Sequence, residues 1–320
     1  MKRRLPVYIL LFVALVSACS GSATTQNNNS AGASAGSQQA KTADNQNREL
    51  QKELEQIAAA AKGRVGVQAV VIETGETVSL NPNEHFPMQS VYKFPIGMAV
   101  LQQVDAGKLK LEQRVRVEKS DFVREGQRSP VRDKNPQGVE LSVGELLRFA
   151  VSESDGTASD VLLKLAGGAE AVNGYLKQLE VTDLVVANSE KEIGQDWETQ
   201  YRNWASPESA VKLLRALYDG RGLSAQSQKL LLKLMTETPT GPKRLKGLLP
   251  VGTIVAHKTG TSGANASGIN AATNDIGIVT LPNGRHLAIA VFVSDSPANE
   301  ATREGVIAKV ARAVWDKWSK

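Results

Sequence analysis

The sequence predicts a mixed α/β (α+β) fold, in which a mainly antiparallel sheet is built from the N- and C-terminal segments and an all-helical lobe is inserted between them. Three observations support this fold class: strand patterns near both ends of the chain, helical patterns in the middle, and a tight-turn signal between the last two strands. One sheet is then assembled from distant segments. Ligand sites commonly lie at a seam such as the one between this sheet and the helical lobe.

The first part of the folded chain is expected to form a helix followed by a hairpin. From about Arg48, apolar residues recur at helical spacing. Residues 65–72 and 77–80 have strand patterns and are separated by the polar turn Glu73-Thr74-Gly75-Glu76. These two segments supply the first strands of the sheet.

The middle of the chain, about residues 85–240, carries mainly helical patterns and is expected to form the inserted lobe. The expected helices are residues 94–106, 143–151, 158–166, 207–218 and 226–235. Three of them are followed by a glycine, which is typical of a helix C-terminus. Ser206 before Pro207 supplies a good helix start.

The last part of the chain returns to strand patterns and ends in a helix. Strands are expected over residues 253–258, 275–281 and 286–294, and Pro282-Asn283-Gly284 joins the last two as a hairpin turn. An apolar stripe predicts a terminal helix over residues 299–318.

The first 47 residues are expected to lie outside this domain, which then covers residues 48–320. Residues 1–18 combine three basic residues with an apolar run too short to span a bilayer comfortably, as in an export signal. Small residues before Cys19 resemble a bacterial lipobox, so we expect a lipid on Cys19 to hold the exported protein to a membrane, on the periplasmic or cell-surface side. Loss of Cys19 with an ordinary signal is the alternative. Residues 19–47 are a low-complexity tether.

Composition narrows the function classes. The formal net charge of +5 falls to about +2 without the three basic residues of the signal, and no basic stripe is interleaved with aromatic residues, so nucleic acid is not an expected partner. The single cysteine and the three histidines, His85, His257 and His286, give no zinc-type spacing. We expect no metal and no cofactor.

Ser90 and Lys93 stand three residues apart where a turn-rich segment gives way to a helical pattern, so both side chains should project from one helix face. A lysine that is desolvated or close to other cations can take the proton of a serine and make it a nucleophile. The helix N-terminus adds amide donors for an oxyanion. Alone the pattern is weak, because roughly one S-x-x-K is expected by chance in such a chain.

Two further segments offer matching chemistry. Lys258-Thr259-Gly260-Thr261-Ser262-Gly263 lies at the end of an expected edge strand, where its ammonium and hydroxyls can hold a carboxylate and its first glycine lets a ligand approach the backbone. Ser154-Asp155-Gly156 lies between two helical patterns, and its serine could pass a proton to a leaving group. Alone, the first could be a polar turn and the second a helix-to-helix loop capped by its aspartate.

In this order the three elements resemble the S-x-x-K, S-D-x and K-T-G motifs of class A β-lactamases and penicillin-binding proteins. From about residue 48 onward the chain resembles class A β-lactamases, and segments 201–204, 244–250 and 255–263 resemble the extended-spectrum PER-type branch. The resemblance implies a β-lactamase/transpeptidase-like fold. It also implies hydrolysis of penicillins and cephalosporins through a serine acyl-enzyme, which would confer resistance to these antibiotics. We expect the protein to be a monomer.

The resemblance gives each motif residue a role. Ser90 is acylated, with Lys93, or Glu190 through a water, as the base, and the backbone amides of Ser90 and Thr261 hold the oxyanion. Ser154 protonates the departing nitrogen. Glu190 activates the water that releases Ser90, with Glu192 as its rival. The residues expected to bind the substrate carboxylate are Lys258, Thr259, Gly260, Thr261 and Arg244.

Two glycines depart from the family pattern. Gly156 replaces the usual asparagine of S-D-N, and Gly194 replaces the asparagine that usually shares the hydrolytic water with the glutamate. Each change removes a polar contact worth about 1 to 3 kcal/mol, so turnover is expected to be about ten- to a hundredfold weaker and acylation less affected. Asp160 and Asn203 fit the reversed pair that braces the active-site loop in the PER-type branch, so this loop should be shaped unlike that of most class A enzymes.

Two other functions share parts of this pattern. A D,D-peptidase acting on cell-wall peptides has the same three motifs but traps β-lactams, and Glu190 argues against it. A non-hydrolytic penicillin-sensing or cell-wall-binding lipoprotein would keep the cleft without turnover, and the intact pair Ser90 and Lys93 argues against that.

Overall fold

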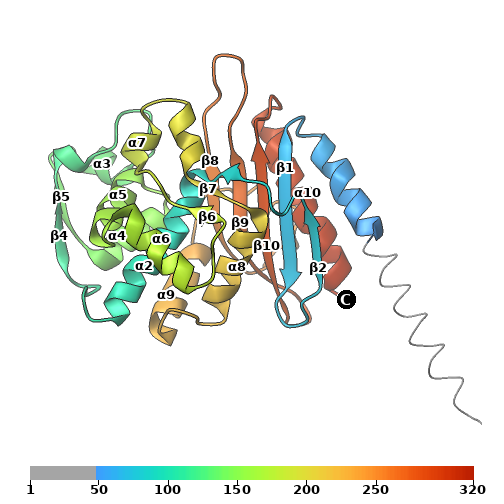
Figure 1. Ribbon diagram of the computed structural model, residues 1–320, viewed down its shortest axis with the longest axis horizontal. Helices are drawn as coiled ribbons and strands as arrows, with labels where there is room; N and C mark the ends of the chain where they lie inside the picture. Colours follow the sequence, from blue (N-terminus) through green and yellow to red (C-terminus); the bar gives the residue numbers. More distant parts are fainter. Residues whose placement is uncertain (1–47) are drawn as a thin grey trace, which may run out of the picture. The chain divides into compact units, whose positions relative to one another are not determined.

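The computed structural model describes residues 48–320, and the predictions for residues 1–47, including Cys19, lie outside the described residues. The predicted fold class is confirmed: an antiparallel five-stranded sheet stands beside a lobe of helices (Figure 1). Among residues 48–320, no helix is both long enough and apolar enough to cross a membrane.

The sheet joins both ends of the described chain. Its strands are β1 (Arg64–Val71), β2 (Thr77–Leu80), β8 (Val255–Thr261), β9 (Thr273–Thr280) and β10 (His286–Ser294). Their order is β2-β1-β10-β9-β8, and every neighbouring pair runs antiparallel. The register of β1 on β10 pairs Gln68 with Ala290, so distant segments form the centre of the sheet as predicted.

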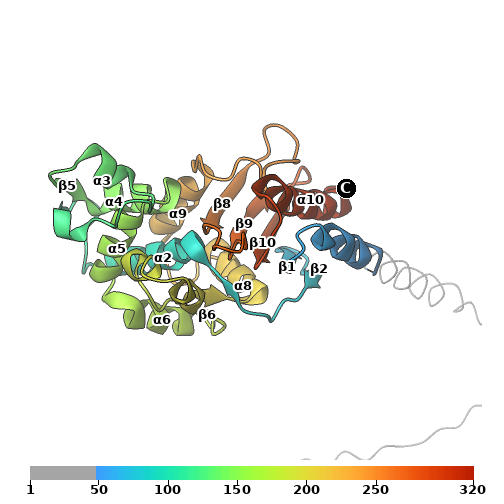
Figure 2. The same cartoon turned by 90° about the horizontal axis from the view of Figure 1, so that it is seen from above.

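Side chains of β10 alternate between two cores, as a strand with two covered faces requires. Leu287, Ile289 and Val291 pack with residues 48–59 and α10 (Glu300–Trp318), whereas Ala290 and Phe292 belong to the core shared with the helical lobe. Figure 2 shows α10 and the N-terminal helix on one side of the sheet and α8 on the other. The predicted stripe of the last helix is buried.

The helical lobe contains all five predicted helices. Its helices are α2 (Lys93–Asp105), α3 (Pro130–Lys134), α4 (Val143–Leu147), α5 (Gly156–Leu165), α6 (Gly168–Gln178), α7 (Glu190–Ile193), α8 (Pro207–Tyr218) and α9 (Ala225–Thr236). The predicted helix 143–151 is α4 followed by a π-helical turn, η3 (Arg148–Ser152), which leads into Ser154. Such π-turns are frequent at functional sites.

Some elements have too little sequence signal to be predicted. Helix α6 begins at Gly168, and both Gly168 and the preceding Gly167 have a left-handed backbone, which breaks the helical pattern at its start. Strands β3 (Phe86–Pro87), β6 (Leu184–Val185) and β7 (Trp204–Ala205) are two residues each, and β4 (Arg114–Val117) pairs with β5 (Val139–Ser142). Strand β8 also starts later and ends later than predicted, so Thr259 and Gly260 lie inside the strand with Lys258 and not beyond its end.

Candidate active site

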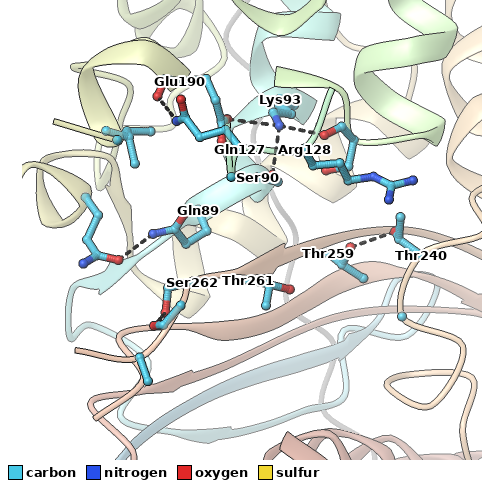
Figure 3. Close-up of a pocket in the computed structure, with 18 of the residues that line it drawn as sticks. Gln89, Ser90, Lys93, Gln127, Arg128, Glu190, Thr240, Thr259, Thr261 and Ser262 are labelled. Atoms are coloured by element: carbon cyan, nitrogen blue, oxygen red, sulfur yellow. Dashed lines mark hydrogen bonds and ion pairs between the residues drawn. The ribbon is translucent and has the colours of Figure 1, made fainter. Parts of the chain in front are cut away.

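A pocket of about 660 Å³ lies between β8 and the helical lobe. Its lining includes Ser90, Lys93, Ser154 and Glu190, which come from three separate stretches of the helical lobe. Figure 3 shows Ser90, Lys93, Gln127 and Glu190 on one side of this space, with the strand bearing Thr259 and Thr261 opposite. The fold therefore brings most of the predicted motif residues together around one cavity, whereas Lys258 and Gly260 lie outside its lining.

Ser90 lies in a short 3₁₀-helix, η1 (Gln89–Tyr92), directly before α2, and not within the first turn of α2 as expected. The preceding residue, Gln89, has a left-handed backbone with φ of 48°, and its buried side chain donates to Gln200 Oε1 at 2.7 Å. A non-glycine residue held in this region stores backbone strain, which is common at active sites. The neighbouring contacts fix the turn that presents Ser90.

The nucleophile segment is also tied to the sheet. Asn274 on β9 is fully buried, and its Nδ2 donates to the carbonyls of Pro87 at 2.8 Å and Met88 at 3.2 Å. A Cβ at Gly260 would lie 2.2 Å from the Met88 carbonyl oxygen. The glycine of the K-T-G motif is thus required by the approach of the Met88 backbone, whereas the sequence had suggested the approach of a ligand.

The ammonium group of Lys93 is buried between three oxygen atoms. Its Nζ donates to Ser90 Oγ at 2.9 Å and to the Ser154 carbonyl at 2.9 Å, and it pairs with Glu190 Oε2 at 3.1 Å. All three protons of a charged lysine are then used. Lys93 can accept the proton of Ser90 only after passing one to Glu190, so both predicted choices of base remain compatible with the geometry.

Glu190 opens the short helix α7, and its carboxylate turns into the pocket. Besides Lys93, it accepts a hydrogen bond from the Tyr92 hydroxyl at 2.7 Å. Burial alone would raise the pKa of Glu190, but Lys93, the Tyr92 bond and Lys258 together hold that pKa below its usual value. Burial and the Glu190 charge raise the pKa of Tyr92 well above its usual value, so its phenol remains a donor. Tyr92 was not among the predicted site residues.

The rival carboxylate, Glu192, has a different task. Its Oε2 accepts from the Ser189 backbone at 2.7 Å and the Ser189 hydroxyl at 2.9 Å, which forms a capping box at the start of α7. Glu192 does not line the pocket. The geometry therefore favours Glu190 for chemistry on a bound ligand.

The loop that carries Glu190 is braced at two points. Asp160 on α5 accepts from the backbone amides of Glu190 at 2.6 Å and Lys191 at 3.1 Å. Asn203 accepts from Ala187 N at 2.7 Å and donates to Asn188 O at 2.8 Å. Burial raises the pKa of Asp160 to about 6 despite these amide bonds. Both predicted bracing residues lie against the loop.

Ser154 connects the two lobes through Lys258. Its hydroxyl accepts from Lys258 Nζ at 2.9 Å, and its backbone is left-handed with φ of 59°. Lys258 is fully buried and lies behind Ser154, outside the pocket lining. Burial, reinforced by the charge of Lys93, lowers the pKa of Lys258 well below its usual value. This lysine is placed to exchange a proton with Ser154.

Arg244 supports the β8 wall of the pocket. Its Nη2 donates to Thr261 Oγ1 at 2.7 Å, and its Nη1 donates to the carbonyls of Gly260 and Asn274, both at 3.0 Å. Its Nε pairs with Glu304 at 3.1 Å. Most of its donors are therefore used within the protein, although Arg244 also lines the pocket beside Thr261.

The two glycines that depart from the family pattern face occupied space. A Cβ at Gly156 would lie 2.7 Å from Glu190 Cγ, and a Cβ at Gly194 would lie 2.7 Å from both Arg124 Nη2 and Gln127 Nε2. Real Cβ atoms do not tolerate such distances without displacement of the neighbour. The present position of Glu190 depends on glycine at residue 156.

Two other groups of residues in the described part of the chain have suggestive chemistry but do not build a second site of this kind. Ser209 and Lys212 repeat the S-x-x-K spacing inside α8, but Ser209 accepts from the Asp183 backbone and Lys212 pairs with Glu208 on the surface. His257 is buried against Asp275, with Nδ1 2.9 Å from its carboxylate. Over residues 48–320, no three histidine, cysteine, aspartate or glutamate side chains cluster so that they could hold a metal ion.

Comparison with known proteins places this geometry in context. Residues 49–318 match the family model described as the β-lactamase enzyme family. The chain is 42% identical over 269 residues to the β-lactamase VEB-1 of Pseudomonas aeruginosa, covering 83% of this chain and 89% of that protein. It is 44% identical over 268 residues to the extended-spectrum β-lactamase PER-1 of Pseudomonas aeruginosa, covering 83% and 86%.

Solved structures give the same picture. The fold matches the crystal structure of the TLA-1 extended-spectrum β-lactamase with a TM-score of 0.83 at 43% identity, over 85% of this chain and 99% of that one. It matches a β-lactamase from Chitinophaga pinensis with a TM-score of 0.82 at 47% identity, over 84% and 99%.

Proposed function

The chain belongs to the β-lactamase enzyme family as a class A serine enzyme that hydrolyses β-lactams, and on that premise we propose that Ser90 is the residue acylated by the substrate. The observation that carries this assignment is the position of Lys93 Nζ, 2.9 Å from Ser90 Oγ and 3.1 Å from Glu190. A serine with a base in hydrogen-bond reach, and a third group that orients the base, is the arrangement of an activated nucleophile.

Acylation proceeds by attack of Ser90 Oγ on the lactam carbonyl carbon. The Ser90 proton passes to Lys93 after Lys93 has given one to Glu190, or it passes to Glu190 through a water. The backbone amides of Ser90 and Thr261 hold the oxyanion, and the Asn274 contacts that tie the Ser90 segment to the sheet support this role. Collapse of the intermediate breaks the lactam C–N bond.

Ser154 protonates the departing nitrogen, and Lys258 restores the proton to Ser154. The 2.9 Å contact between Lys258 Nζ and Ser154 Oγ supports this relay. The lowered pKa of Lys258 supports it too, because an ammonium group with a lower pKa gives up its proton more readily. Before release, Glu190 gives up the proton that it gained during acylation, and this proton replaces the one that Lys258 gave to Ser154. A water then gives a proton to Glu190 as its oxygen bonds to the acyl carbon, and that proton passes to Ser90 as the ester bond breaks.

The substrate carboxylate is held along β8. Thr259, Thr261 and the guanidinium of Arg244 line the pocket there, and Lys258 lies behind the lining, where its Nζ donates to the Thr259 carbonyl. Gly260 contributes indirectly, because it lets the strand approach Met88. Since the residues of the site come from a single chain, we also propose that the enzyme acts as a monomer.

The proposal is tested by mixing the purified protein with a chromogenic cephalosporin and following both steady-state turnover and the mass of the protein. We expect sustained turnover and a transient acyl adduct on the peptide that contains Ser90. A stoichiometric burst with a lasting adduct would favour a D,D-peptidase instead. Absence of any adduct would contradict both catalytic functions and favour a penicillin-sensing lipoprotein.

Gly156→Asn is predicted to slow release of the acyl-enzyme, even though it restores the usual family residue. The new Cβ would lie 2.7 Å from Glu190 Cγ and would push the carboxylate away from the pocket. We expect kcat to fall about 10- to 100-fold, equivalent to about 1.4 to 2.8 kcal/mol, with acyl-enzyme accumulating. Gly174→Asn is the matched control, because a Cβ there meets no neighbour. Turnover equal to or above that of the wild type would contradict the prediction.

We propose that the enzyme is exported and held to a bacterial membrane, at the periplasmic or cell-surface side, by a lipid on Cys19. The proposal is supported by the basic and apolar residues before Cys19, the small residues at its cleavage site and the polar segment 19–47, which is long enough to serve as a tether.

Cys19→Ala is predicted to move the enzyme from the membrane to the soluble fraction of a bacterial host that lipidates proteins. Activity per molecule should not change, because every residue that lines the pocket belongs to residues 89–264. Fractionation and metabolic labelling with palmitate measure the effect. Equal distribution of the two proteins, with no label on the wild type, would show that this anchor is absent.

A further inference from the structure

Gln127 reaches across the pocket wall to the loop that carries Glu190. It belongs to the segment before α3, 63 residues earlier in the chain, and its Nε2 donates to the Glu190 carbonyl at 2.5 Å. Its Oε1 accepts from the Arg124 backbone at 3.3 Å. Figure 3 shows the Gln127 side chain beside Glu190, facing the same space as Lys93 and Ser90.

The amide of Gln127 occupies space that the α7 loop leaves open. Gly194 ends α7, and a Cβ added there would lie 2.7 Å from Gln127 Nε2 and 2.8 Å from its Cδ. A side chain at residue 194 and the present position of Gln127 therefore exclude one another. The amide of Gln127 thus occupies the space that a side chain at residue 194 would otherwise fill.

This amide keeps hydrogen-bonding capacity for the pocket. A glutamine amide has two N–H donors and two acceptor lone pairs on oxygen. The Glu190 carbonyl uses one donor and the Arg124 amide uses one acceptor site, which leaves one of each. On Glu190 itself, Oε2 takes both Tyr92 and Lys93, so Oε1 is the oxygen free to meet a water beside Gln127.

We propose that Gln127 is a positioning residue for deacylation, whose amide holds the hydrolytic water against Glu190. This inference rests on the proposed role of Glu190. In the step concerned, Glu190 takes one proton of the water, the oxygen bonds to the acyl carbonyl carbon, and the ester bond to Ser90 then breaks as Ser90 regains a proton. Gln127 neither gains nor loses a proton, and it limits the positions open to the attacking oxygen.

The test compares Gln127→Ala, Gly194→Asn and the double variant by stopped-flow and intact mass spectrometry with a chromogenic cephalosporin. We expect Gln127→Ala to slow deacylation about 10- to 100-fold, as for other lost positioning contacts, while acylation stays within about threefold. Gly194→Asn alone should also slow deacylation, because the new side chain collides with Gln127. In the double variant, the asparagine can enter the space that Gln127 has left once the exposed end of the Arg124 side chain, which a Cβ at residue 194 also meets at 2.7 Å, moves into solvent. Deacylation should then recover at least tenfold over Gln127→Ala.

The recovery separates positioning of the water from simple support of the loop. If Gln127 only stabilised the loop, Gln127→Ala would lower the melting temperature and impair both steps, and an asparagine at residue 194 would not restore the rate. Gln195→Ala is the matched control on the same loop, since Gln195 is exposed and does not line the pocket.

Two results would overturn the inference: deacylation of Gln127→Ala at the wild-type rate, or a double variant no faster than Gln127→Ala. Failure of the proposed function looks different, because the wild-type protein itself would then show no acyl adduct or no release from it.

Discussion

Ser90→Ala is expected to abolish covalent attachment of β-lactams and to lower turnover at least about 10⁴-fold, because no other hydroxyl of residues 48–320 is placed against Lys93 in the same way. Ser90 Oγ is 2.9 Å from Lys93 Nζ, whereas Ser154 directs its carbonyl, and not its hydroxyl, to that lysine. The alanine removes the nucleophile and leaves the Lys93 and Glu190 pair intact. Intact mass after incubation with a cephalosporin, together with steady-state rates, measures both effects.

Ser209→Ala is the matched control for this experiment, because Ser209 begins the second S-x-x-K of the chain. Its hydroxyl accepts from the Asp183 backbone at 3.2 Å, so the substitution should cost about 1 kcal/mol of stability and leave the adduct unchanged. A full acyl adduct on the Ser90→Ala protein would refute the assignment of the nucleophile and direct the search to Ser154.

The two S-x-x-K patterns show what the sequence could and could not decide. Spacing alone makes Ser90 and Ser209 equivalent. They differ in their neighbours: the fold places residues 154, 190 and 258 of the other motifs close to Ser90. The order of the motifs along the chain was enough to predict this assembly, because it matched a family pattern and not because any single spacing was specific.

The fold was largely predictable because its main elements carry strong periodic signals. The five helices and the strand pairs β1/β2 and β9/β10 have long apolar patterns bounded by turn residues or glycines. Helix α6 and the two-residue strands have no such signal. Their positions are set by contacts with distant parts of the chain, as in the pairing of Phe86 with Ala205.

The same limit applies to the site. Tyr92, Gln127 and Asn274 have no motif of their own, and their functional contacts join residues that are 98, 63 and 187 positions apart in sequence. Gly260 was predicted as a residue of the motif but for a different reason, since only the structure shows the Met88 carbonyl against it. The sequence shows which residue type stands at a position. Which distant residue makes that type necessary is known only from the tertiary structure.

Glu190→Gln is expected to stop the reaction after acylation. Glutamine keeps the shape of the side chain but cannot take a proton from the hydrolytic water, so deacylation should fall about 10²- to 10⁴-fold and acyl-enzyme should accumulate on Ser90. Lys93 and Tyr92 hold the pKa of Glu190 below its usual value in spite of its burial. The wild-type carboxylate therefore stays ionised in mild acid, and its deacylation rate should decline only below the ordinary carboxyl range. The variant should lack that acidic limb.

Glu192→Gln separates this role from a general effect of charge on α7. Glu192 is exposed, lies two residues along the same short helix and caps its start through Ser189, so its substitution should weaken the cap by about 1 kcal/mol and leave deacylation unchanged. If Glu192→Gln trapped the acyl-enzyme while Glu190→Gln released it, the base would have to be reassigned. Glu190 contacts Lys93 and Tyr92, whereas Glu192 contacts only the cap of its own helix in these bonds. The deacylation rate of Glu190→Gln is therefore expected to be at least 10²-fold lower than that of Glu192→Gln, which is the contribution attributed to proton transfer.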